Sequence, residues 1–324
     1  MYDVVIIGGG PAGLAASAVV RSAGMDNILI IDRENSLGGT LNQCIHTGFG
    51  LQVFKEDLTG TEFAQRLIDE INRLGIQYKL NTTVLEISSD KEIVAVSGAE
   101  GIINIKAAAV IFAVGRREMP RSVINITGTR CSGILTAGAA QKLINLDGYM
   151  PGKEAVIFGS GDIGLIMARR LVIEGAKVKA VIEQQNYCRG NERYQEECLQ
   201  DFDIPLMLNH TIVGIDGDDR VRGIRAAQLD DKGNLLEGSE KYIDCDTVLL
   251  AVETVPESGL AVQAGAKTSL ETGALYIDEN MQTTIEGIFA CGSVLHEGME
   301  ADSAVIEGYR AGRSTADYLM GLKK

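Results

Sequence analysis

Short apolar runs alternate along the chain with glycine-rich turns and with longer stretches of mixed apolar and polar residues. Residues 4–7 and 28–31 are two such runs, and a mostly apolar stretch that ends at Gly24 lies between them. Four apolar residues bounded by turn residues are typical of a buried strand, whereas the longer stretch is typical of a helix. The beginning of the chain therefore predicts a β-α-β unit with parallel strands.

The same order of elements recurs 151 residues further along the chain. Residues 155–158 and 178–182 are predicted strands, and the predicted helix between them ends at Gly175. Five positions of the first copy have counterparts in the second: Gly8 and Gly159, Gly10 and Gly161, Gly13 and Gly164, Gly24 and Gly175, Asp32 and Glu183. This repeat predicts an α/β protein with two Rossmann-like domains.

Each copy carries the G-x-G-x-x-G pattern between its first strand and its helix. In dinucleotide-binding proteins the first glycine permits a tight turn, the second lets the backbone approach a pyrophosphate, and the third lets helix pack on strand. The helix N-terminus offers unpaired N–H groups to the anion. The acidic residue, 19 positions after the third glycine in both copies, is expected to bind a ribose hydroxyl. A glycine-rich turn that binds nothing is the alternative.

Antiparallel strands are predicted after each copy. Residues 83–97 and 102–115 predict hairpin strands with intervening turns, and residues 221–229 and 246–252 predict a strand and its return strand. Residues 276–291 predict another short strand pair, followed by a final helix from about Asp302.

Length and charge narrow the possible classes of protein. The 324 residues suggest about two domains, and the net charge of −14 disfavours binding to nucleic acid or to an anionic membrane. The first residues lack the basic start of a signal peptide and no 18-residue apolar window occurs, so we expect a cytoplasmic protein. Six cysteines lie far apart without a C-x-x-C, and there are three histidines, which disfavours disulfides and a zinc site. No metal is expected.

Two dinucleotide sites on one chain favour electron transfer between two cofactors. A nicotinamide delivers a hydride, and a flavin accepts it and can pass on single electrons. Positioning the two rings is then the main catalytic task, and no acid or nucleophile is required for the hydride itself.

The chain resembles the two-domain FAD/NAD(P) oxidoreductases, of which low-molecular-weight thioredoxin reductase is the simplest member. The matching segments are residues 8–13 with Asp32, residues 37–40, 113–115 and 159–164 with Glu183, and residues 287–292. The resemblance implies two three-layer ββα domains, with an NAD(H)-binding domain (117–252) inserted in a discontinuous FAD-binding domain (1–116 and 253–324).

The resemblance also implies the residues that bind each cofactor. For FAD these are Gly8, Gly10, Pro11, Ala12, Gly13, Asp32, Arg33, Gly39, Thr40, Val84, Ala113, Gly115, Gly292 and Ser293. For the nicotinamide cofactor they are Gly159, Gly161, Asp162, Ile163 and Glu183. NADH is expected rather than NADPH, because Gln184 and Gln185 follow Glu183 and the sequence shows no arginine beside a 2′-phosphate.

A closer resemblance is to small oxidoreductases without a redox dithiol, carried by residues 42–50, 58–60, 136–141 and 292–296. Members of that group accompany a glycerol-3-phosphate-dehydrogenase-like flavoprotein, or form the dinucleotide-binding subunit of amine oxidases, opine oxidases and hydrogen cyanide synthase. Two departures from thioredoxin reductase matter. Cys131 stands alone where that enzyme has a C-x-x-C, and Ser293 replaces an aspartate that binds the ribityl chain of the flavin.

Cys44 and His46 are the candidate catalytic residues. Cys44 is either a single redox thiol facing the flavin or a packed thiol that lines the flavin pocket. His46 either protonates the reduced flavin or an acceptor, or makes only a local hydrogen bond.

Three functions remain open. The first is an NADH-dependent FAD oxidoreductase that relays electrons to or from a partner flavoprotein or an iron–sulfur subunit. The second is a free-standing NADH oxidase or diaphorase, and the third is a non-catalytic redox-sensing subunit that binds both dinucleotides. A homodimer is compatible with each of them.

Overall fold

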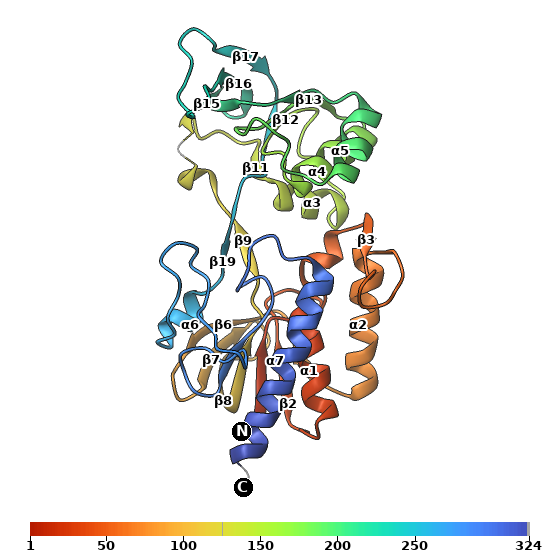
Figure 1. Cartoon of the computed structure of the whole chain (residues 1–324), viewed down its shortest axis with the longest axis vertical. Coiled ribbons are helices and arrows are strands. Elements are labelled where there is room, and N and C mark those ends of the chain that lie inside the picture. Colours follow the sequence, from red (N-terminus) through yellow and green to blue (C-terminus); the bar gives the residue numbers. More distant parts are fainter. Residues whose placement is uncertain (125, 323–324) are drawn as a thin grey trace. The chain divides into compact units, whose positions relative to one another are not determined.

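The computed structural model describes residues 1–124 and 126–322, and it divides the chain into two compact units (Figure 1). Unit 1 comprises Met1–Arg117 and Val255–Lys324, and unit 2 comprises Glu118–Thr254. The boundaries expected from the sequence lie within one or two residues of these. The chain passes between the units through β9 (Arg116–Glu118) and β19 (Thr254–Pro256), which pair with each other.

The central sheet of unit 1 has the strand order β5-β2-β1-β8-β7-β6, and β20 also pairs with β8. β1 (Tyr2–Ile7), β2 (Ile28–Ile31) and β5 (Gln77–Lys79) are parallel, and the apolar residues of β1 and β2 are buried from Val4 to Ile7 and from Ile28 to Ile31. Burial on both faces explains why these strands are continuous apolar runs rather than alternating ones.

β8 (Gly101–Phe112) belongs to two parts of this sheet. Its first half pairs antiparallel with β7 (Glu92–Ser97), which pairs with β6 (Thr82–Ile87), so the predicted hairpin strands form a three-stranded meander. Its second half is parallel to β1 and to β20 (Ile288–Ala290). The long apolar run that ends at Phe112 therefore reaches the centre of the parallel sheet.

Helices α1 (Pro11–Ser22), α2 (Gly60–Leu74) and α7 (Ala301–Leu322) accompany the parallel strands (Figure 1). α1 and α7 pack very closely. A Cβ at Gly308 would overlap the carbonyl oxygen of Ala12, and a Cβ at Gly312 would overlap that of Ala16. Small residues on both helices permit this approach. The start of α7 is thereby fixed beside the start of α1.

Shorter elements complete unit 1. They are η1 (Gly39–Gln43), β3 (Thr47–Phe49), β4 (Leu58–Thr59) and α6 (Gly259–Gln263). α2 begins with a capping box in which Thr59 and Glu62 satisfy each other's backbone N–H groups.

Unit 2 contains a five-stranded parallel sheet and a four-stranded sheet. The parallel sheet has the order β11 (Ile134–Thr136), β18 (Thr247–Leu250), β12 (Glu154–Phe158), β13 (Lys177–Ile182) and β14 (Leu206–Met207). Three helices accompany it: α3 (Ala137–Asn145), α4 (Asp162–Ile173) and α5 (Glu192–Cys198). The second sheet has the order β10 (Thr127–Gly128), β15 (His210–Gly217), β16 (Val221–Gln228) and β17 (Lys241–Asp244). Two short 3-10 helices, η2 (Arg121–Val123) and η3 (Gln200–Phe202), also lie in this unit.

The side chains of β12 show how the three layers of unit 2 are built. Ala155 and Ile157 pack in the cluster that contains Leu165 of α4, whereas Val156 and Phe158 pack in the cluster that contains residues of the second sheet. Both faces of the parallel sheet are therefore buried, one by helices and one by a sheet. The predicted α/β class with Rossmann-like domains is confirmed.

Two local predictions need correction. The predicted return strand of residues 246–252 does not pair with β16; its core, β18, lies parallel to β12 and β11, and β17 pairs with β16 instead. Residues 276–291 form one strand, β20, with isolated bridges such as Ile277–Thr283 rather than a strand pair. β-propensity alone does not distinguish a hairpin partner from a parallel neighbour.

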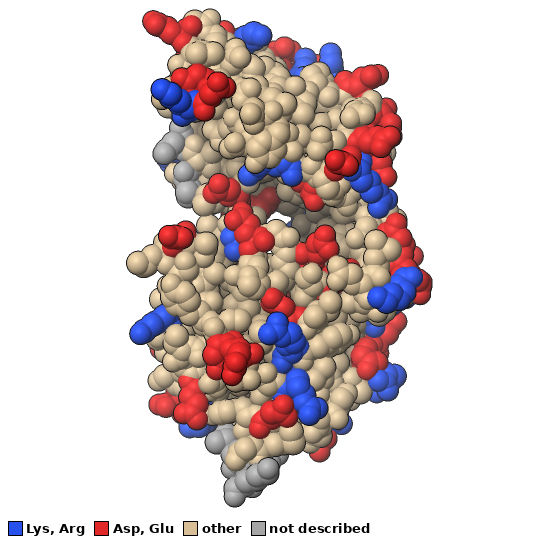
Figure 2. All heavy atoms as spheres, in the orientation of Figure 1, with Lys and Arg blue, Asp and Glu red and all other residues tan. Residues whose placement is uncertain are grey.

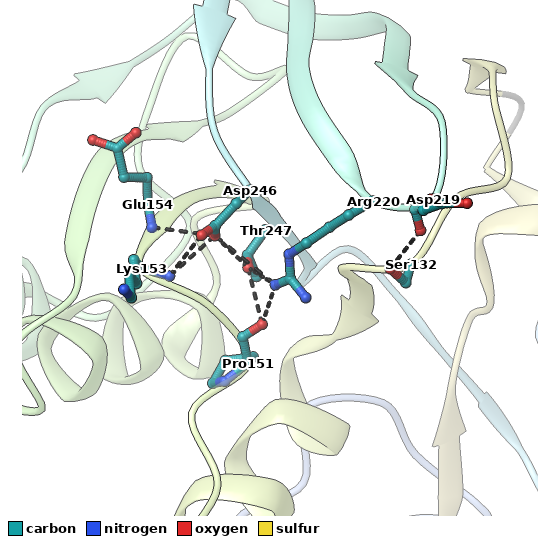
Figure 3. A network of polar contacts seen from close by, with 8 residues as sticks. All are labelled: Ser132, Pro151, Lys153, Glu154, Asp219, Arg220, Asp246 and Thr247. Atoms are coloured by element: carbon teal, nitrogen blue, oxygen red, sulfur yellow. Dashed lines mark hydrogen bonds and ion pairs between the residues drawn. The ribbon is translucent and has the colours of Figure 1, made fainter.

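A network of polar contacts links the starts of β12 and β18 in the parallel sheet of unit 2 (Figure 3). The carboxylate of Asp246, just before β18, accepts from the backbone N–H of Lys153 at 3.0 Å and of Glu154 at 3.2 Å, at the start of β12. Arg220 donates to the carbonyl oxygen of Pro151 and, at 3.0 Å, to Thr247 Oγ1. The network lies where β12 and β18 begin. The glycine-rich turn follows the other end of β12, so the two features lie at opposite ends of the strands.

On the face seen in Figure 2, acidic and basic side chains are interspersed over both units. Within the described part of the chain, none of the helices is long and apolar enough to cross a membrane.

Candidate functional site

The first glycine-rich turn, between β1 and α1, is held by close backbone contacts. Gly8 has φ +107°, and a Cβ there would overlap the carbonyl oxygen of Ala113, which follows β8. A Cβ at Gly13 would overlap the carbonyl oxygen of Gly8. Both positions therefore require glycine for reasons internal to the fold.

Gly10 is different, because nothing in the chain itself requires glycine there. Its backbone is extended, with φ −78° and ψ −177°, a conformation that any residue adopts. A Cβ at Gly10 would meet nothing within 4 Å. Gly10 directly precedes Pro11, the first residue of α1, so the space beside it lies at a helix N-terminus. The residues present fit a pyrophosphate that approaches the backbone at this point.

Asp32 is fixed beside this turn at the end of β2. The side chain is 8% exposed and accepts from Gly9 N–H at 2.6 Å and from Glu34 N–H at 2.8 Å. The adjacent Arg33 is largely exposed and lies 3.8 Å from a carboxylate oxygen of Glu257. A carboxylate in this place is suited to a ribose hydroxyl.

Distant segments of unit 1 meet at the start of α1. A Cβ at Gly39 would lie 3.0 Å from Gly10 Cα, and a Cβ at Gly292 would lie 2.8 Å from Ala12 Cβ. Ser293 Oγ would be 3.7 Å from a Cβ at Gly115. The predicted residues Gly39, Gly115, Gly292 and Ser293 thus gather around the same turn.

Two further predicted residues of unit 1, Thr40 and Val84, are linked to the turn through residues close to them in the chain. Thr40 is exposed in η1, next to Gly39. Val84 lies on β6, two residues after Thr82, whose N–H donates to the Asp32 carbonyl oxygen at 3.0 Å.

The second glycine-rich turn, in unit 2, repeats the geometry of the first. Gly159 has φ +108°, and a Cβ there would overlap the carbonyl oxygen of Ala251. Gly161 has an extended backbone, and a Cβ there would meet nothing within 4 Å. This turn also leaves space for a ligand at the N-terminus of a helix, α4.

Glu183 occupies the position of Asp32 in unit 2 and is 3% exposed. One carboxylate oxygen accepts from Ser160 Oγ at 2.6 Å and from Ser160 N–H at 3.0 Å, and the other accepts from Gln185 N–H at 2.9 Å. Burial alone would raise the pKa of Glu183, but these hydrogen bonds and the charge of Arg189 hold the pKa below its usual value.

Arg189 is a residue that the sequence analysis missed, and it corrects the expectation of no arginine beside this acid. Arg189 Nε lies 3.3 Å from Glu183 Oε2, and Arg189 also donates to the carbonyl oxygen of Val252 at 3.0 Å. The six-residue separation hid the pair, because the loop after β13 folds back: Arg189 N–H donates to Ser160 Oγ at 2.9 Å.

The other predicted residues of unit 2 follow Gly161 directly. Asp162 is the first residue of α4, and its carboxylate accepts from Asn191 N–H at 2.9 Å, which ties the start of α5 to the start of α4. Ile163 is partly buried against the core of the helical layer.

Cys44 and His46 lie in the segment between η1 and β3. Cys44 contacts the first residue of α2, since a Cβ at Gly60 would lie 2.6 Å from Cys44 Cβ, and its thiol donates to the Thr40 carbonyl at 3.4 Å. Burial raises the pKa of the Cys44 thiol to about 12. His46 Nδ1 lies 2.9 Å from the Thr47 carbonyl oxygen, and the ring packs on Phe49 with centroids 5.1 Å apart. These contacts favour a packed thiol over a thiolate nucleophile.

Asp302, on the first turn of α7, is another residue that the sequence analysis missed. It is 5% exposed and accepts from the backbone N–H groups of Gly50 at 2.8 Å, Gln52 at 3.0 Å and Val53 at 2.8 Å. Asp302 thereby anchors the loop that follows Cys44 and His46. A sequence separation of about 250 residues gives no local signal for such a contact.

Residues 2–308 match the model of the pyridine nucleotide-disulphide oxidoreductase family. The chain belongs to this family. It is similar to a CoA-dependent NAD(P)H sulfur oxidoreductase of Pyrococcus abyssi, with 29% identity over 90% of this chain and 62% of the relative. It is also similar to an opine oxidase subunit of Agrobacterium tumefaciens, with 26% identity over 90% of this chain and 61% of the relative. The crystal structure of T. acidophilum thioredoxin reductase matches with a TM-score of 0.80 and 24% identity over 98% of both chains.

Membership of the family establishes the general activity. The protein is an FAD-containing NAD(P)H oxidoreductase. The family name refers to a disulphide, but among the described residues no disulphide bond joins any of the cysteines, which are Cys44, Cys131, Cys188, Cys198, Cys245 and Cys291.

Proposed function

We propose that this protein moves a hydride between a nicotinamide held by unit 2 and a flavin held by unit 1, and relays electrons to or from a partner flavoprotein or iron–sulfur subunit. The observation that carries the proposal is the pair Gly10 and Gly161. Neither backbone strain nor packing explains glycine at these two positions, whereas a pyrophosphate beside each of them does.

In this assignment FAD lies along the start of α1. The N–H groups there would hold the pyrophosphate, Asp32 would bind the adenosine ribose, and Gly39, Gly115 and Ser293 would contact the rest of the cofactor. A bound flavin supplies the ability to accept a hydride and to release single electrons. The protein's own task is to hold the ring in place and exclude competing reactions.

NADH is proposed as the preferred nucleotide because of the Glu183–Arg189 pair. The buried carboxylate would repel a 2′-phosphate, and the positive charge of Arg189 is already paired with it at 3.3 Å. The test is rapid mixing of the FAD-loaded protein with each nucleotide. We expect flavin reduction to be at least tenfold more efficient with NADH; equal or higher efficiency with NADPH would overturn the preference.

Two observations support a partner protein. One similar protein, from Agrobacterium tumefaciens, is named as a subunit of opine oxidase and so as one part of a larger enzyme. In addition, the thiol of Cys44 has a pKa of about 12, so it is protonated at neutral pH and is a poor relay for electrons. Electrons from the flavin would then leave through another protein rather than through Cys44.

Kinetics of the purified chain test the relay. With NADH we expect slow reduction of oxygen and fast reduction of an artificial dye, because the dye replaces the missing partner. Affinity capture from a native extract is expected to recover a second flavoprotein or an iron–sulfur protein. Rapid oxygen turnover by the isolated chain would instead support a free-standing NADH oxidase, and failure to turn over even the dye would support a non-catalytic role.

A further inference from the structure

Glu307, on the second turn of α7, is a carboxylate that none of the roles above uses. Its side chain is only 14% exposed, although it carries a charge on a helix that reaches the molecular surface. Glu307 Oε2 accepts from the backbone N–H of Gly292 at 3.0 Å. Glu307 Oε1 lies 3.0 Å from Nε2 of His296, whose side chain is 57% exposed. One carboxylate therefore holds both ends of the turn formed by residues 292–296.

This turn follows β20 and lies between the end of β8 and the start of α1. Cys291 N–H donates to the Phe112 carbonyl oxygen at 3.0 Å, and Leu295 N–H closes the turn on the Gly292 carbonyl at 2.9 Å. On the other side, a Cβ at Gly292 would lie 2.8 Å from Ala12 Cβ. Small displacements of the turn would therefore change the space at the N-terminus of α1.

α7 is itself fixed relative to the same place. Gly308, the neighbour of Glu307, lies so close to α1 that a Cβ would overlap the Ala12 carbonyl oxygen. The carboxylate thus projects from a helix that cannot move independently of the glycine-rich turn. Burial and then the charge of Glu307 raise the pKa of the Cys291 thiol, so this carboxylate lies close to the residue just before the turn.

We propose that Glu307 is a positioning residue for FAD: by accepting the Gly292 N–H, it holds the 292–296 turn so that Ser293 faces the cofactor. The proposal rests on the assignment of FAD to unit 1. Glu307 acts from behind the turn, since its two oxygens are directed to Gly292 and His296. A hydrogen bond to a charged acceptor in a partly buried site is among the stronger ones in proteins.

The test is the affinity of the apoprotein for FAD, measured by titration with flavin fluorescence. We expect Glu307→Ala to weaken FAD binding at least tenfold and to alter the visible circular dichroism of the bound flavin. Glu307→Gln retains an oxygen that can accept from Gly292 N–H, so its dissociation constant is expected within threefold of the wild-type value. NADH binding to unit 2 should be unchanged in both variants.

Asp317→Asn is the matched control, because Asp317 is an exposed carboxylate on the same helix, paired with Arg313 at 3.3 Å. It should leave the affinity for FAD unchanged. If Glu307→Ala does not fold, Glu307→Asp and Glu307→Gln decide instead. Aspartate keeps the charge but is shorter, so we expect it to bind FAD more weakly than the glutamine variant; the reverse order would overturn the proposal.

Two negative results have different meanings. If Gly10→Val abolishes FAD binding while Glu307→Ala binds FAD within twofold of wild type, Glu307 has no positioning role and the FAD site stands. If Gly10→Val retains full FAD binding, the assignment of FAD to unit 1 fails first, and the positioning role fails with it.

Discussion

The two glycine-rich turns share a backbone frame and differ in what surrounds it. Gly8 N–H donates to the Ile31 carbonyl at 2.9 Å, and its counterpart Gly159 N–H donates to the Ile182 carbonyl at 2.8 Å. In both copies the acid accepts from the residue after the first glycine and from the residue two positions beyond itself. These contacts join groups of the protein itself and recur in both copies. The frame therefore stabilises the fold, in addition to any role in binding a ligand.

The surroundings distinguish the two copies. In unit 1 the turn is enclosed by distant segments that contain Gly39 and Gly292, and Asp32 accepts from two backbone N–H groups. In unit 2 the corresponding acid, Glu183, also binds the hydroxyl of Ser160 and the guanidinium of Arg189. If unit 1 binds FAD and unit 2 binds NADH, as proposed, the two cofactors are distinguished by the segments around each turn and not by the backbone frame that the turns share.

The largest expected effect comes from breaking the frame itself. Gly8→Ala and Gly159→Ala each place a Cβ on a carbonyl oxygen at a positive φ, so each should lower the free energy of unfolding by about 3 kcal/mol. Urea denaturation measures the change. Because the frames are alike, the two losses should be similar.

Gly24→Ala is the control for these two variants. Gly24 also has a positive φ, +90°, but a Cβ there would meet nothing within 4 Å. It should therefore cost only the conformational strain, about 1 kcal/mol. A loss at Gly24 as large as that at Gly8 would show that the contact with Ala113 is unimportant.

A smaller effect is expected where the two copies differ. Glu183→Gln removes the charge that faces Arg189 and should lower the free energy of unfolding by about 2 kcal/mol, whereas Asp32→Asn should cost about 1 kcal/mol. Equal losses in urea denaturation at pH 7 would mean that Arg189 adds nothing to the site.

The pH dependence of the same variants sharpens the comparison. Because the pKa of Glu183 is lowered in the folded protein, its stabilising contribution is present above the unfolded-state pKa and is lost as the pH falls through the folded-state value. Glu183→Gln should therefore remove part of the loss of stability that wild type shows below about pH 4.5. An unchanged pH profile in urea denaturation would contradict the shift.

The smallest effect concerns Cys44, which has no counterpart in unit 2. Its thiol has a pKa of about 12 and is protonated at pH 7, so Cys44→Ser should keep the rate of flavin reduction by NADH within about twofold. Rapid mixing under anaerobic conditions measures that rate. Loss of steady-state turnover with FAD still bound would make the single redox thiol the favoured mechanism.

The repeat allowed much of the fold to be predicted from the sequence. Residues 28–31 are predicted as a strand and form β2, and the helices predicted to end at Gly24 and Gly175 end just before those glycines. Apolar runs, glycine spacing and the acid are local signals, and the frame of each turn depends on local contacts. The gathering of Gly39, Gly115 and Ser293 was expected only through resemblance to a family.

What the sequence did not predict depends on contacts between distant residues. Asp302, Glu307 and Arg189 are charged residues on helices or loops, where a charge usually means only exposure to solvent. Their roles follow from the burial that the fold imposes and from hydrogen bonds to backbone groups up to 252 residues away. Residue type and spacing carry no signal of such partners.

The most direct test of the account is a pair of variants, Gly10→Val and Gly161→Val, in which FAD content and NADH binding are both measured. A Cβ at either position meets no atom of the protein within 4 Å, so we expect both variants to fold. We expect Gly10→Val to lose FAD and retain NADH binding, and Gly161→Val to retain FAD and lose NADH binding. Full retention of both cofactors by either variant, or loss of the same cofactor in both, would contradict the assignment of one dinucleotide to each unit.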